Sequence, residues 1–502
     1  MDTMTRSLAK SPETFDTVNP ATDEVIATFP VCGQSEVDAV LGQAQEAARW
    51  WAGLDWKERQ RRLLAWKSHL MRYIGRLAEL VHNETGKPLA DAQLEIFVSV
   101  LHIDWAARNA RKVLGPHRVR SGLAAINLAS TVEYHPLGVV GVIGPWNYPV
   151  LTPMGSLAYA LAAGNAVVFK PSEYTPAVGG WLVSSLREVV PEQPVLQLVT
   201  GAGPTGEALA RSGVDKLAFT GSAGTARRVM AACADNLTPL IAECGGKDAL
   251  LVAADADLDA AADAAAWGAV SNGGQTCVGV ERVYVVSDVY QKFLEKLTER
   301  LAGTRPGDDR TAGYGPMTMP GQADVIEQHI ADALARGGRT VLGGMQSIHR
   351  PYISPVVLTD VPEESRAVQE ETFGPTVTVT AVADLDEAIQ LANAGRYGLG
   401  SAVFTKRRKR GMATARALRA GMTSVNSVLG FVTVPALPFG GVGDSGFGRI
   451  HGADGLREFT RPKAITRLRM RPPLNLTSLS RPEKDLRRLL TAGTLLHGKN
   501  YR

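Results

Sequence analysis

The chain has 502 residues, with 54 Lys and Arg residues against 50 Asp and Glu residues. Its composition of 45% hydrophobic and 21% charged residues is ordinary for a globular protein, which excludes intrinsic disorder, a collagen-like fibre and a disulfide scaffold. At roughly 100–200 residues per domain, two or three domains are expected. Four cysteines in so long a chain favour reduced thiols and a cytoplasmic location.

The net charge of +4 is distributed unevenly along the chain. From Arg461 to Arg502 there are 11 Lys and Arg residues and two acids, which gives this tail +9 and leaves −5 for the rest. An acidic body argues against an extended nucleic-acid surface, so we expect no nucleic-acid partner. No stretch reaches the roughly 18 uninterrupted apolar residues that a membrane-spanning helix needs.

Short apolar runs rich in β-forming residues alternate with stretches of helical period. The runs that we predict as strands are 139–143, 166–169, 195–199, 217–219, 249–252 and 282–286. The stretches that we predict as helices include 178–189, 290–301, 323–336 and 384–391. This alternation is typical of parallel sheets with helices on their faces, so we predict two α/β domains in series.

Two segments interrupt this alternation. Residues 118–135 contain a Ser-Gly turn and are predicted to form an inserted hairpin, and residues 463–469 alternate polar and apolar side chains as an exposed strand does. Strands that project from a compact body commonly pair with another subunit. We therefore expect a small β oligomerisation element and a homodimer or homotetramer.

One glycine-rich segment is easily mistaken for a cofactor signal. Gly201-Ala-Gly203-Pro-Thr-Gly206 matches the G-x-G-x-x-G pattern, follows an apolar strand and precedes a helical stretch. The acidic residue expected about 20 residues further on is missing. Pro204 also removes one amide donor from the loop. We interpret the segment as a tight loop, with a pyrophosphate-binding loop as the alternative.

Cys277 follows a run of small residues, Gly273-Gly-Gln-Thr, which lets a ligand and backbone amides approach it closely. As a thiolate it would be a strong nucleophile, although a buried packing cysteine is an equally good reading of this loop. Glu243 stands among apolar residues and two glycines, where partial desolvation would raise its pKa toward that of a general base. The alternative for Glu243 is a surface position before a turn.

Asn147 stands between Pro145 and Pro149, which fix the backbone around its side-chain amide. A rigidly held amide can stabilise a developing oxyanion, although an Asn that satisfies its own turn is about equally common. The sequence has no His-Glu-x-x-His motif, and we expect no metal site.

Taken together, these segments resemble the aldehyde dehydrogenase superfamily, in its NAD(P)-dependent, hydrolytic branch. The resemblance covers about residues 15 to 465, with the motifs in the family's order and near its spacing. The matching stretches are Gly144-Pro-Trp-Asn-Tyr-Pro, Lys170-Pro-Ser-Glu173, Phe219-Thr-Gly-Ser222, Glu243-Cys-Gly-Gly-Lys247, Gly274-Gln-Thr-Cys277, Glu371-Thr-Phe373-Gly-Pro375 and Pro438-Phe-Gly-Gly441.

The resemblance implies a role for each matching residue. Cys277 matches the catalytic nucleophile, Asn147 the oxyanion-binding amide and Glu243 the general base that activates water. The residues that match the family's cofactor site are Trp146, Lys170, Ser172, Glu173, Gly221, Ser222, Gly245, Glu371 and Phe373. The negative charge of Glu173 favours NAD, and NADP remains an alternative because family members with this motif tolerate it.

The resemblance also implies a domain layout. It implies two Rossmann-like parallel-sheet domains, with residues 1–117 and 137–248 binding the cofactor and residues 249–448 forming the catalytic domain. Residues 118–136 and 449–471 would be the oligomerisation segments, and residues 472–502 a basic C-terminal extension.

The residues that match the family's aldehyde tunnel, Tyr148, Thr152, Gly155 and Phe439, lie in largely apolar stretches. We therefore predict a medium- or long-chain or aromatic aldehyde as the substrate, because an apolar pocket suits an apolar ligand. Gly279-Val-Glu-Arg282 resembles some succinate-semialdehyde dehydrogenases, which keeps that substrate open. A coenzyme A-acylating enzyme and a non-catalytic relative are further alternatives, which the presence of Glu243 and Cys277 disfavours.

Within the extension, leucines recur at helical spacing among basic residues. The residues concerned are Leu486, Leu489, Leu490 and Leu496, with Lys484, Arg487 and Arg488. A basic amphipathic helix could dock on anionic lipid, but covering a neighbouring subunit is the better prediction.

Overall fold

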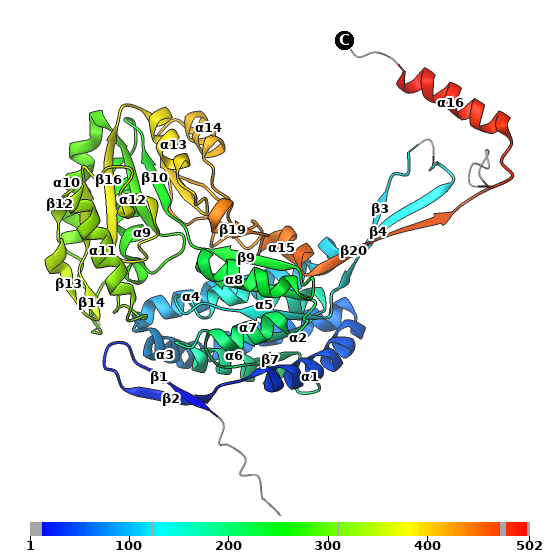
Figure 1. Ribbon diagram of the computed structural model, residues 1–502, viewed down its shortest axis with the longest axis horizontal. Coiled ribbons are helices and arrows are strands. Elements are labelled where there is room, and N and C mark those ends of the chain that lie inside the picture. Colours follow the sequence, from blue (N-terminus) through cyan, green and yellow to red (C-terminus); the bar gives the residue numbers. More distant parts are fainter. Residues whose placement is uncertain (1–12, 123–124, 310, 472–477, 499–502) are drawn as a thin grey trace, which may run out of the picture. The chain divides into compact units, whose positions relative to one another are not determined.

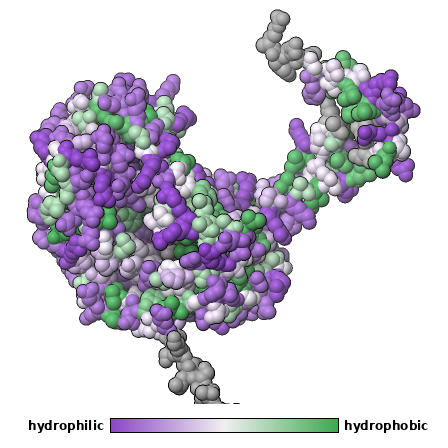
Figure 2. Space-filling model, in the orientation of Figure 1, coloured by the Kyte–Doolittle hydropathy of each residue, from purple (hydrophilic) through white to green (hydrophobic). Residues whose placement is uncertain are grey.

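The computed structural model describes residues 13–122, 125–309, 311–471 and 478–498 (Figure 1). The chain forms two compact units. Unit 1 comprises Met1–Val113 and Pro136–Arg461, and unit 2 comprises Leu114–His135 and Pro462–Arg502. Hydrophilic residues cover much of the face of unit 1 that Figure 2 shows, with smaller hydrophobic areas among them.

Unit 1 begins with an antiparallel pair of strands and four helices. These elements are β1 (Thr14–Val18), β2 (Val25–Pro30), α1 (Gln34–Gly53), α2 (Trp56–Arg72), α3 (Ile74–Thr85) and α4 (Leu89–Leu114). Helix α1 contacts the first large sheet, whereas α2 and α3 contact helix α6 (Pro176–Val189). The two tryptophans Trp51 and Trp66 are fully buried, which anchors α1 and α2 to the core.

The first large sheet has the strand order β19-β9-β8-β5-β6-β7. Its strands are β5 (Val139–Ile143), β6 (Ala166–Lys170), β7 (Leu196–Leu198), β8 (Lys216–Gly221), β9 (Leu240–Cys244) and β19 (Gly446–Phe447). Its connecting helices are α5 (Leu151–Ala163), α6, α7 (Gly203–Arg211) and α8 (Ala223–Ala234). The strands are parallel except β19, which runs antiparallel to β9.

The order of these strands reverses between β5 and β8. From β5 the chain adds β6 and β7 on one side and then returns to add β8 and β9 on the other. Ligands of open α/β sheets bind in the crevice outside the carboxyl ends of the strands at such a switch point. The segments that follow β5 and β8 carry Asn147 and Ser222, respectively.

The second large sheet has the strand order β12-β15-β16-β11-β10-β17-β18. Its strands are β10 (Asp248–Val252), β11 (Val280–Val286), β12 (Arg339–Leu342), β15 (Val356–Thr359), β16 (Thr376–Val382), β17 (Ser401–Phe404) and β18 (Ser424–Val425). The helices of this part are α9 (Leu258–Val270), α10 (Ser287–Ala302), α11 (Gln322–Ala335), α12 (Arg366–Gln369), α13 (Leu385–Ala394) and α14 (Arg408–Ala417).

Short elements complete unit 1. They are the 3-10 turns η2 (Ser271–Gly274), η3 (Met345–Ser347) and η4 (Gly443–Ser445), the strand pair β13 (Ile348–His349) and β14 (Tyr352–Ile353), and helix α15 (Gly452–Glu458). Helix α15 contacts α5.

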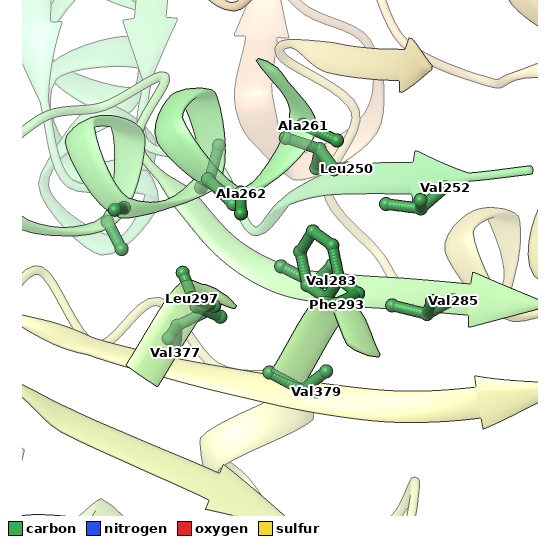
Figure 3. Packing of buried hydrophobic residues seen from close by; sticks show 14 of the residues in the cluster. Leu250, Val252, Ala261, Ala262, Val283, Val285, Phe293, Leu297, Val377 and Val379 are labelled. Carbon is green, nitrogen blue, oxygen red and sulfur yellow. The ribbon is translucent and has the colours of Figure 1, made fainter. Parts of the chain in front are cut away.

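The core of the second sheet follows the two-residue period of its strands. Leu250 and Val252 of β10 pack with Phe293 and Leu297 of α10 on one face. Ala249 and Leu251 of the same strand pack with α13 on the other. Figure 3 shows the first of these clusters, with side chains of β10, β11 and β16 gathered against α9 and α10. Strands buried on both faces read as continuous apolar runs, which is why the sequence identified them.

Unit 2 contains a three-stranded sheet in the order β20-β4-β3 and a terminal helix. The elements are β3 (His117–Val119), β4 (Leu128–Pro136), β20 (Thr460–Leu468) and α16 (Glu483–His497). The five leucines of α16 are all exposed. No helix within the described ranges is long and apolar enough to cross a membrane.

The predicted fold class is confirmed, and the six predicted strands all form. Residues 449–461 belong to unit 1, where α15 contacts α5, and Pro462 begins the second part of unit 2. The predicted domain bounds and oligomerisation segments stay predictions. Helix α16 forms where the leucine spacing predicted it, whereas residues 472–477 and 499–502 of the predicted extension lie outside the described residues.

Candidate active site

Two cavities of unit 1 meet at Cys277. The larger cavity, of about 980 Å³, extends along the carboxyl ends of the first sheet. The smaller cavity, of about 180 Å³, lies between α4, α5, α9 and the loops before α15. Cys277 and Thr152 line both cavities. A nucleophile at this junction can contact a ligand in each cavity.

The loop that presents Cys277 has an unusual backbone. Asn272, Gly273 and Gly274 have φ values of 54°, 67° and 71°, a region that favours glycine. A Cβ at Gly274 would collide with the backbone of Gly374, so only glycine allows these two loops to pack together. The run of small residues therefore serves loop packing as well as access to the thiol.

Asn147 is buried and its side-chain amide faces the same loop. Its Nδ2 donates to the carbonyl of Gln275 at 2.9 Å. Gln275 is itself fixed, because its Nε2 donates to Asn272 at 2.8 Å and its Oε1 accepts from the amide of Thr318 at 2.9 Å. An amide nitrogen carries two hydrogens, so Asn147 keeps a second donor for an oxyanion formed near Cys277.

Glu243 stands on β9 and lines the smaller cavity together with Cys277. Its side chain is buried, and its Oε1 has no hydrogen-bond partner among the described residues. Burial raises the pKa of this carboxyl to about 8, against the opposing effect of the Arg449 charge. A carboxyl with this pKa is suited to general base catalysis near neutral pH.

The thiol of Cys277 is neutral in this environment. Burial raises its pKa well above the ordinary value, and the negative charges of Glu243 and Glu371 act in the same direction. The Val278 amide lowers that pKa to a smaller extent. Formation of the reactive thiolate therefore requires a proton acceptor or an additional positive charge in the site.

The larger cavity brings together all nine residues of the expected cofactor site. Its lining includes Trp146, Lys170, Ser172, Glu173, Gly221, Ser222, Gly245, Glu371 and Phe373. Trp146 and Phe373 stand edge to face, with their ring centroids 5.6 Å apart. Glu371 accepts from the amide of Gly246 at 3.1 Å, and burial raises the pKa of this carboxyl to about 8.

Lys170 and Glu173 also line the larger cavity, and they differ in exposure. Lys170 is buried and its Nζ donates to the carbonyl of Pro171 at 2.9 Å. The side chain of Glu173 is 39% exposed, and its Oε2 lies 3.9 Å from the Lys170 Nζ. Burial lowers the pKa of Lys170, while the charge of Glu173 opposes this effect.

The N-terminus of α8 opens on the same cavity. Ser222 caps the helix by accepting from the amide of Thr225 at 3.3 Å. The free amides of a helix N-terminus and its dipole favour an anion such as a phosphate. Arg228 also lines the cavity and donates to the Thr225 hydroxyl at 3.1 Å. Sequence reasoning missed Arg228, although its spacing of three from Thr225 places both on one face of α8.

The G-x-G-x-x-G segment differs from its interpretation as a bare loop. Helix α7 already begins at Gly203, and Ala202, Gly203, Pro204 and Gly206 line the larger cavity. A methyl group at Gly206 would contact the stem of Lys170. The segment thus forms a wall of the cavity beside Lys170.

The smaller cavity contains three of the four predicted tunnel residues, namely Tyr148, Thr152 and Phe439. Gly155, the fourth predicted tunnel residue, is not among the residues that line this cavity. A Cβ at Gly155 would collide with the imidazole of His451, so the space beside this glycine is occupied by His451 rather than open to a substrate. Sequence reasoning also missed Lys87, Asp91 and Glu95, which line the cavity from the start of α4.

Within the described part of the chain, no group of three or more His, Cys, Asp and Glu side chains could hold a metal ion.

Comparison with known proteins agrees with this arrangement. A sequence model of the aldehyde dehydrogenase family matches residues 8–465. A 4,4'-diapolycopene aldehyde oxidase of Methylomonas sp is 37% identical over 462 residues, covering 92% of this chain and 87% of that protein. A relative from Sinorhizobium fredii, described as "Probable succinate-semialdehyde dehydrogenase [NADP(+)]", is 35% identical over 472 residues, covering 91% and 94%.

Solved structures agree with the fold. The betaine aldehyde dehydrogenase of Staphylococcus aureus, solved in complex with NAD+, superposes with a TM-score of 0.87 at 30% identity, covering 93% of this chain and 94% of that one. The family match spans both large sheets and every residue of the two cavities. This chain belongs to the aldehyde dehydrogenase family.

Proposed function

We propose that the protein oxidises an aldehyde to the carboxylic acid through a covalent intermediate on Cys277, with NAD or NADP as the oxidant. The observation that carries this proposal is the position of Cys277 where the two cavities meet. One cavity suits a dinucleotide in size and lining, and the other suits a small organic substrate. The thiol stands between them, where an aldehyde carbon and a hydride acceptor would come together.

The proposed reaction begins when the Cys277 thiol loses its proton to the solvent and the resulting thiolate attacks the aldehyde carbonyl. This step creates an alkoxide, which the second N–H of Asn147 and the backbone amide of Cys277 would stabilise. Loss of a hydride then converts the thiohemiacetal into a thioester. Splitting the oxidation into two steps in this way is the ordinary advantage of a covalent intermediate.

Glu243 completes the reaction in the proposed mechanism. Its carboxylate would take a proton from water, and the resulting hydroxide would hydrolyse the thioester to release the acid. A coenzyme A-acylating enzyme has no need of such a base, so the buried Glu243 supports the hydrolytic reaction. Product analysis with and without coenzyme A tests this, because an acyl-coenzyme A product would contradict the assignment.

The larger cavity fits a nicotinamide dinucleotide, which when bound supplies the hydride acceptor. Trp146 and Phe373 stand edge to face in the lining of this cavity, and the missing Cβ of Gly245 leaves room for the Glu371 carboxylate beside it. Ser222 and the N-terminus of α8 would hold the phosphates. Lys170 and Glu173 would hold the adenosine ribose.

The charges at the ribose end favour NAD but keep NADP as an alternative. Glu173 would repel a 2′-phosphate, whereas the guanidinium of Arg228 in the same cavity would attract one. The similar proteins include examples of both cofactors. The Staphylococcus aureus structure was solved with NAD+, whereas the Sinorhizobium fredii relative is described with NADP(+). We propose NAD as the preferred cofactor.

We propose an apolar aldehyde as the substrate, of medium or long chain or aromatic. The smaller cavity is lined mainly by apolar side chains, among them Leu94, Leu151, Val432, Phe439 and Ile450. Of its described lining residues only Lys87 is a Lys or Arg, and that side chain is ion-paired with Glu95.

This lining gives the carboxylate of succinate semialdehyde no free cation, and Asp91 adds a negative charge. The similarity to a succinate-semialdehyde dehydrogenase keeps that substrate as the second candidate. Catalytic efficiency on hexanal, benzaldehyde and succinate semialdehyde, with each cofactor, tests the assignment. A clear preference for succinate semialdehyde would overturn it.

The activity itself is tested with Cys277→Ser. The variant is expected to lose NADH production with every aldehyde, because serine is a far weaker nucleophile. Unchanged NADH production would mean that Cys277 is not the nucleophile.

We further propose that unit 2 joins subunits into a homodimer or homotetramer. All residues of β3 are exposed, as are most of those of β20, and both strands lie at edges of their sheet. Unpaired edges of this kind are suited to pairing with another chain. Light scattering compares the mass of the assembly formed by the full chain with that formed by a variant ending at Arg471, which tests the contribution of α16. Sedimentation of the same two proteins with anionic vesicles tests lipid binding by α16 instead.

A further inference from the structure

A buried ion pair lies directly behind the segment that carries Asn147. Lys87 follows α3 and Glu95 stands in the second turn of α4, and both side chains are completely buried. A buried ion pair commonly contributes little net stability, because the loss of hydration offsets the attraction. Its position beside the reacting groups therefore calls for a functional explanation.

The pair holds the backbone on both sides of one short segment. The Lys87 Nζ donates to the carbonyl of Asn147 at 2.9 Å. The Glu95 Oε1 accepts from the amides of Val150 and Leu151 at 2.8 and 3.1 Å. These contacts fix the chain from Asn147 to the start of α5.

The carbonyl of Asn147 is also tied to the loop of the nucleophile. Asn272 donates through Nδ2 to this carbonyl at 3.0 Å and to the carbonyl of Gln275 at 3.2 Å. The Asn147 side chain donates to the same Gln275 carbonyl. The orientation of the Asn147 amide relative to Cys277 thus depends on a backbone position that Lys87 helps to set.

Lys87 has no donor left for a substrate. Its ammonium contacts Glu95 and the Asn147 carbonyl, and lies 3.9 Å from the centre of the Tyr148 ring. Tyr148 in turn shares a hydrogen bond of 3.0 Å with the hydroxyl of Thr276, next to the nucleophile. The ammonium therefore makes all its contacts with the protein, and these contacts hold the segment of Asn147 and Tyr148 in place.

We propose that Lys87 and Glu95 are positioning residues, which aim the Asn147 amide at the oxyanion that forms on attack by Cys277. The proposal rests on the function proposed above. Neither residue touches the reacting atoms. A donor misplaced by a fraction of an ångström loses much of its stabilisation of the transition state, so the effect falls on the steps up to hydride loss.

The main test uses Lys87→Met in the full-length protein, with hexanal and NAD. In single-turnover mixing, the rate of NADH formation is expected to fall about 10- to 100-fold, in line with the cost of misplacing a catalytic group. The affinity for NAD, measured by fluorescence, should stay within about twofold, because neither Lys87 nor Glu95 lines the larger cavity. The isotope effect with 1-deuterated hexanal should become smaller, because the attack step, which does not break the C–H bond, is the step that is slowed.

Lys216→Met is the matched control. Lys216 also forms an ion pair, with Glu458, which is partly buried, but neither residue lines either of the two cavities. This variant is expected to lose thermal stability while its single-turnover rate stays near that of the wild type. Glu95→Gln is a milder second variant, because glutamine keeps a carbonyl for the Val150 and Leu151 amides and the protein is then more certain to fold.

A double-mutant cycle with Asn147→Ala separates positioning from general damage. If Lys87 acts through Asn147, adding Lys87→Met to Asn147→Ala should slow NADH formation by less than about twofold further. A full additional loss in that background, or wild-type rates in both Lys87→Met and Glu95→Gln, overturns the proposal. If the wild type itself forms no NADH with any aldehyde, the proposed function fails instead, which is a distinct result.

Discussion

The turnover rate is predicted to follow the fraction of Glu243 that carries the carboxylate. Burial raises the pKa of this carboxyl to about 8, so only about one molecule in ten carries the carboxylate at pH 7, and about nine in ten carry it at pH 9. If thioester hydrolysis limits turnover, the steady-state rate should rise about tenfold between these pH values. The Glu243→Gln variant cannot ionise and should hydrolyse the thioester about 10²- to 10⁴-fold more slowly.

Rapid mixing with excess aldehyde separates the two phases. The burst of NADH reports formation of the thioester, and the steady phase reports its hydrolysis. The variant should therefore give a burst of about one NADH per site followed by almost no turnover. Glu363→Gln removes a partly buried carboxyl that lines neither cavity and should keep both phases. A steady rate that is flat from pH 7 to 9, or sustained turnover by Glu243→Gln, would refute the assignment of the base.

Three further predictions follow from the charges of the site. Because the fold raises the pKa of Glu243 to about 8, the contribution of this residue to stability is fully present below pH 4.5 and is lost as pH rises through 8. The gain in stability of Glu243→Gln over the wild type should therefore be larger at pH 8 than at pH 4.5, by up to about 5 kcal/mol at about 1.4 kcal/mol per pH unit, and thermal unfolding of both proteins at these two pH values checks this. Glu173→Gln should raise kcat/KM with NADP about three- to tenfold relative to NAD, and equal changes for both cofactors would contradict its contact with the ribose. Asp91→Asn should improve kcat/KM on succinate semialdehyde several-fold more than on hexanal, and no difference would show that Asp91 does not face the substrate.

Much of the fold could be predicted because buried parallel strands leave a strong signal. Residues 139–143 form β5 over the predicted bounds, since strands covered on both faces are continuous apolar runs. Strand β9 was not predicted, because the charged side chain of Glu243 interrupts its apolar pattern. The residue that broke the pattern is the one that we propose as the general base.

The nine cofactor residues and the catalytic three were found through motifs, and the structure places the nine in one cavity. Residues outside a motif were missed for physical reasons. Lys87 and Glu95 are eight positions apart, on two sides of a helix start, so no helical spacing relates them. Lys87 contacts the backbone of Asn147 and Glu95 that of Val150 and Leu151, and a contact with backbone leaves no mark on the sequence of the partner.

The surroundings of Gly155 could not be predicted for a related reason. A glycine beside a predicted tunnel suggests open space, yet a side chain from a distant segment can fill that space. His451, nearly 300 positions further along the chain, packs against this glycine. The shape of the smaller cavity depends on such long-range contacts, which is why the substrate class is harder to predict than the reaction.

The most direct test of the account is the mass of the enzyme during turnover. Glu243→Gln should be mixed with hexanal and NAD, quenched in acid and digested, and its peptides analysed by mass spectrometry. We predict a hexanoyl group on the peptide that contains Cys277, formed only when both hexanal and NAD are present. NADH formation without any acyl group on Cys277 would contradict the covalent mechanism.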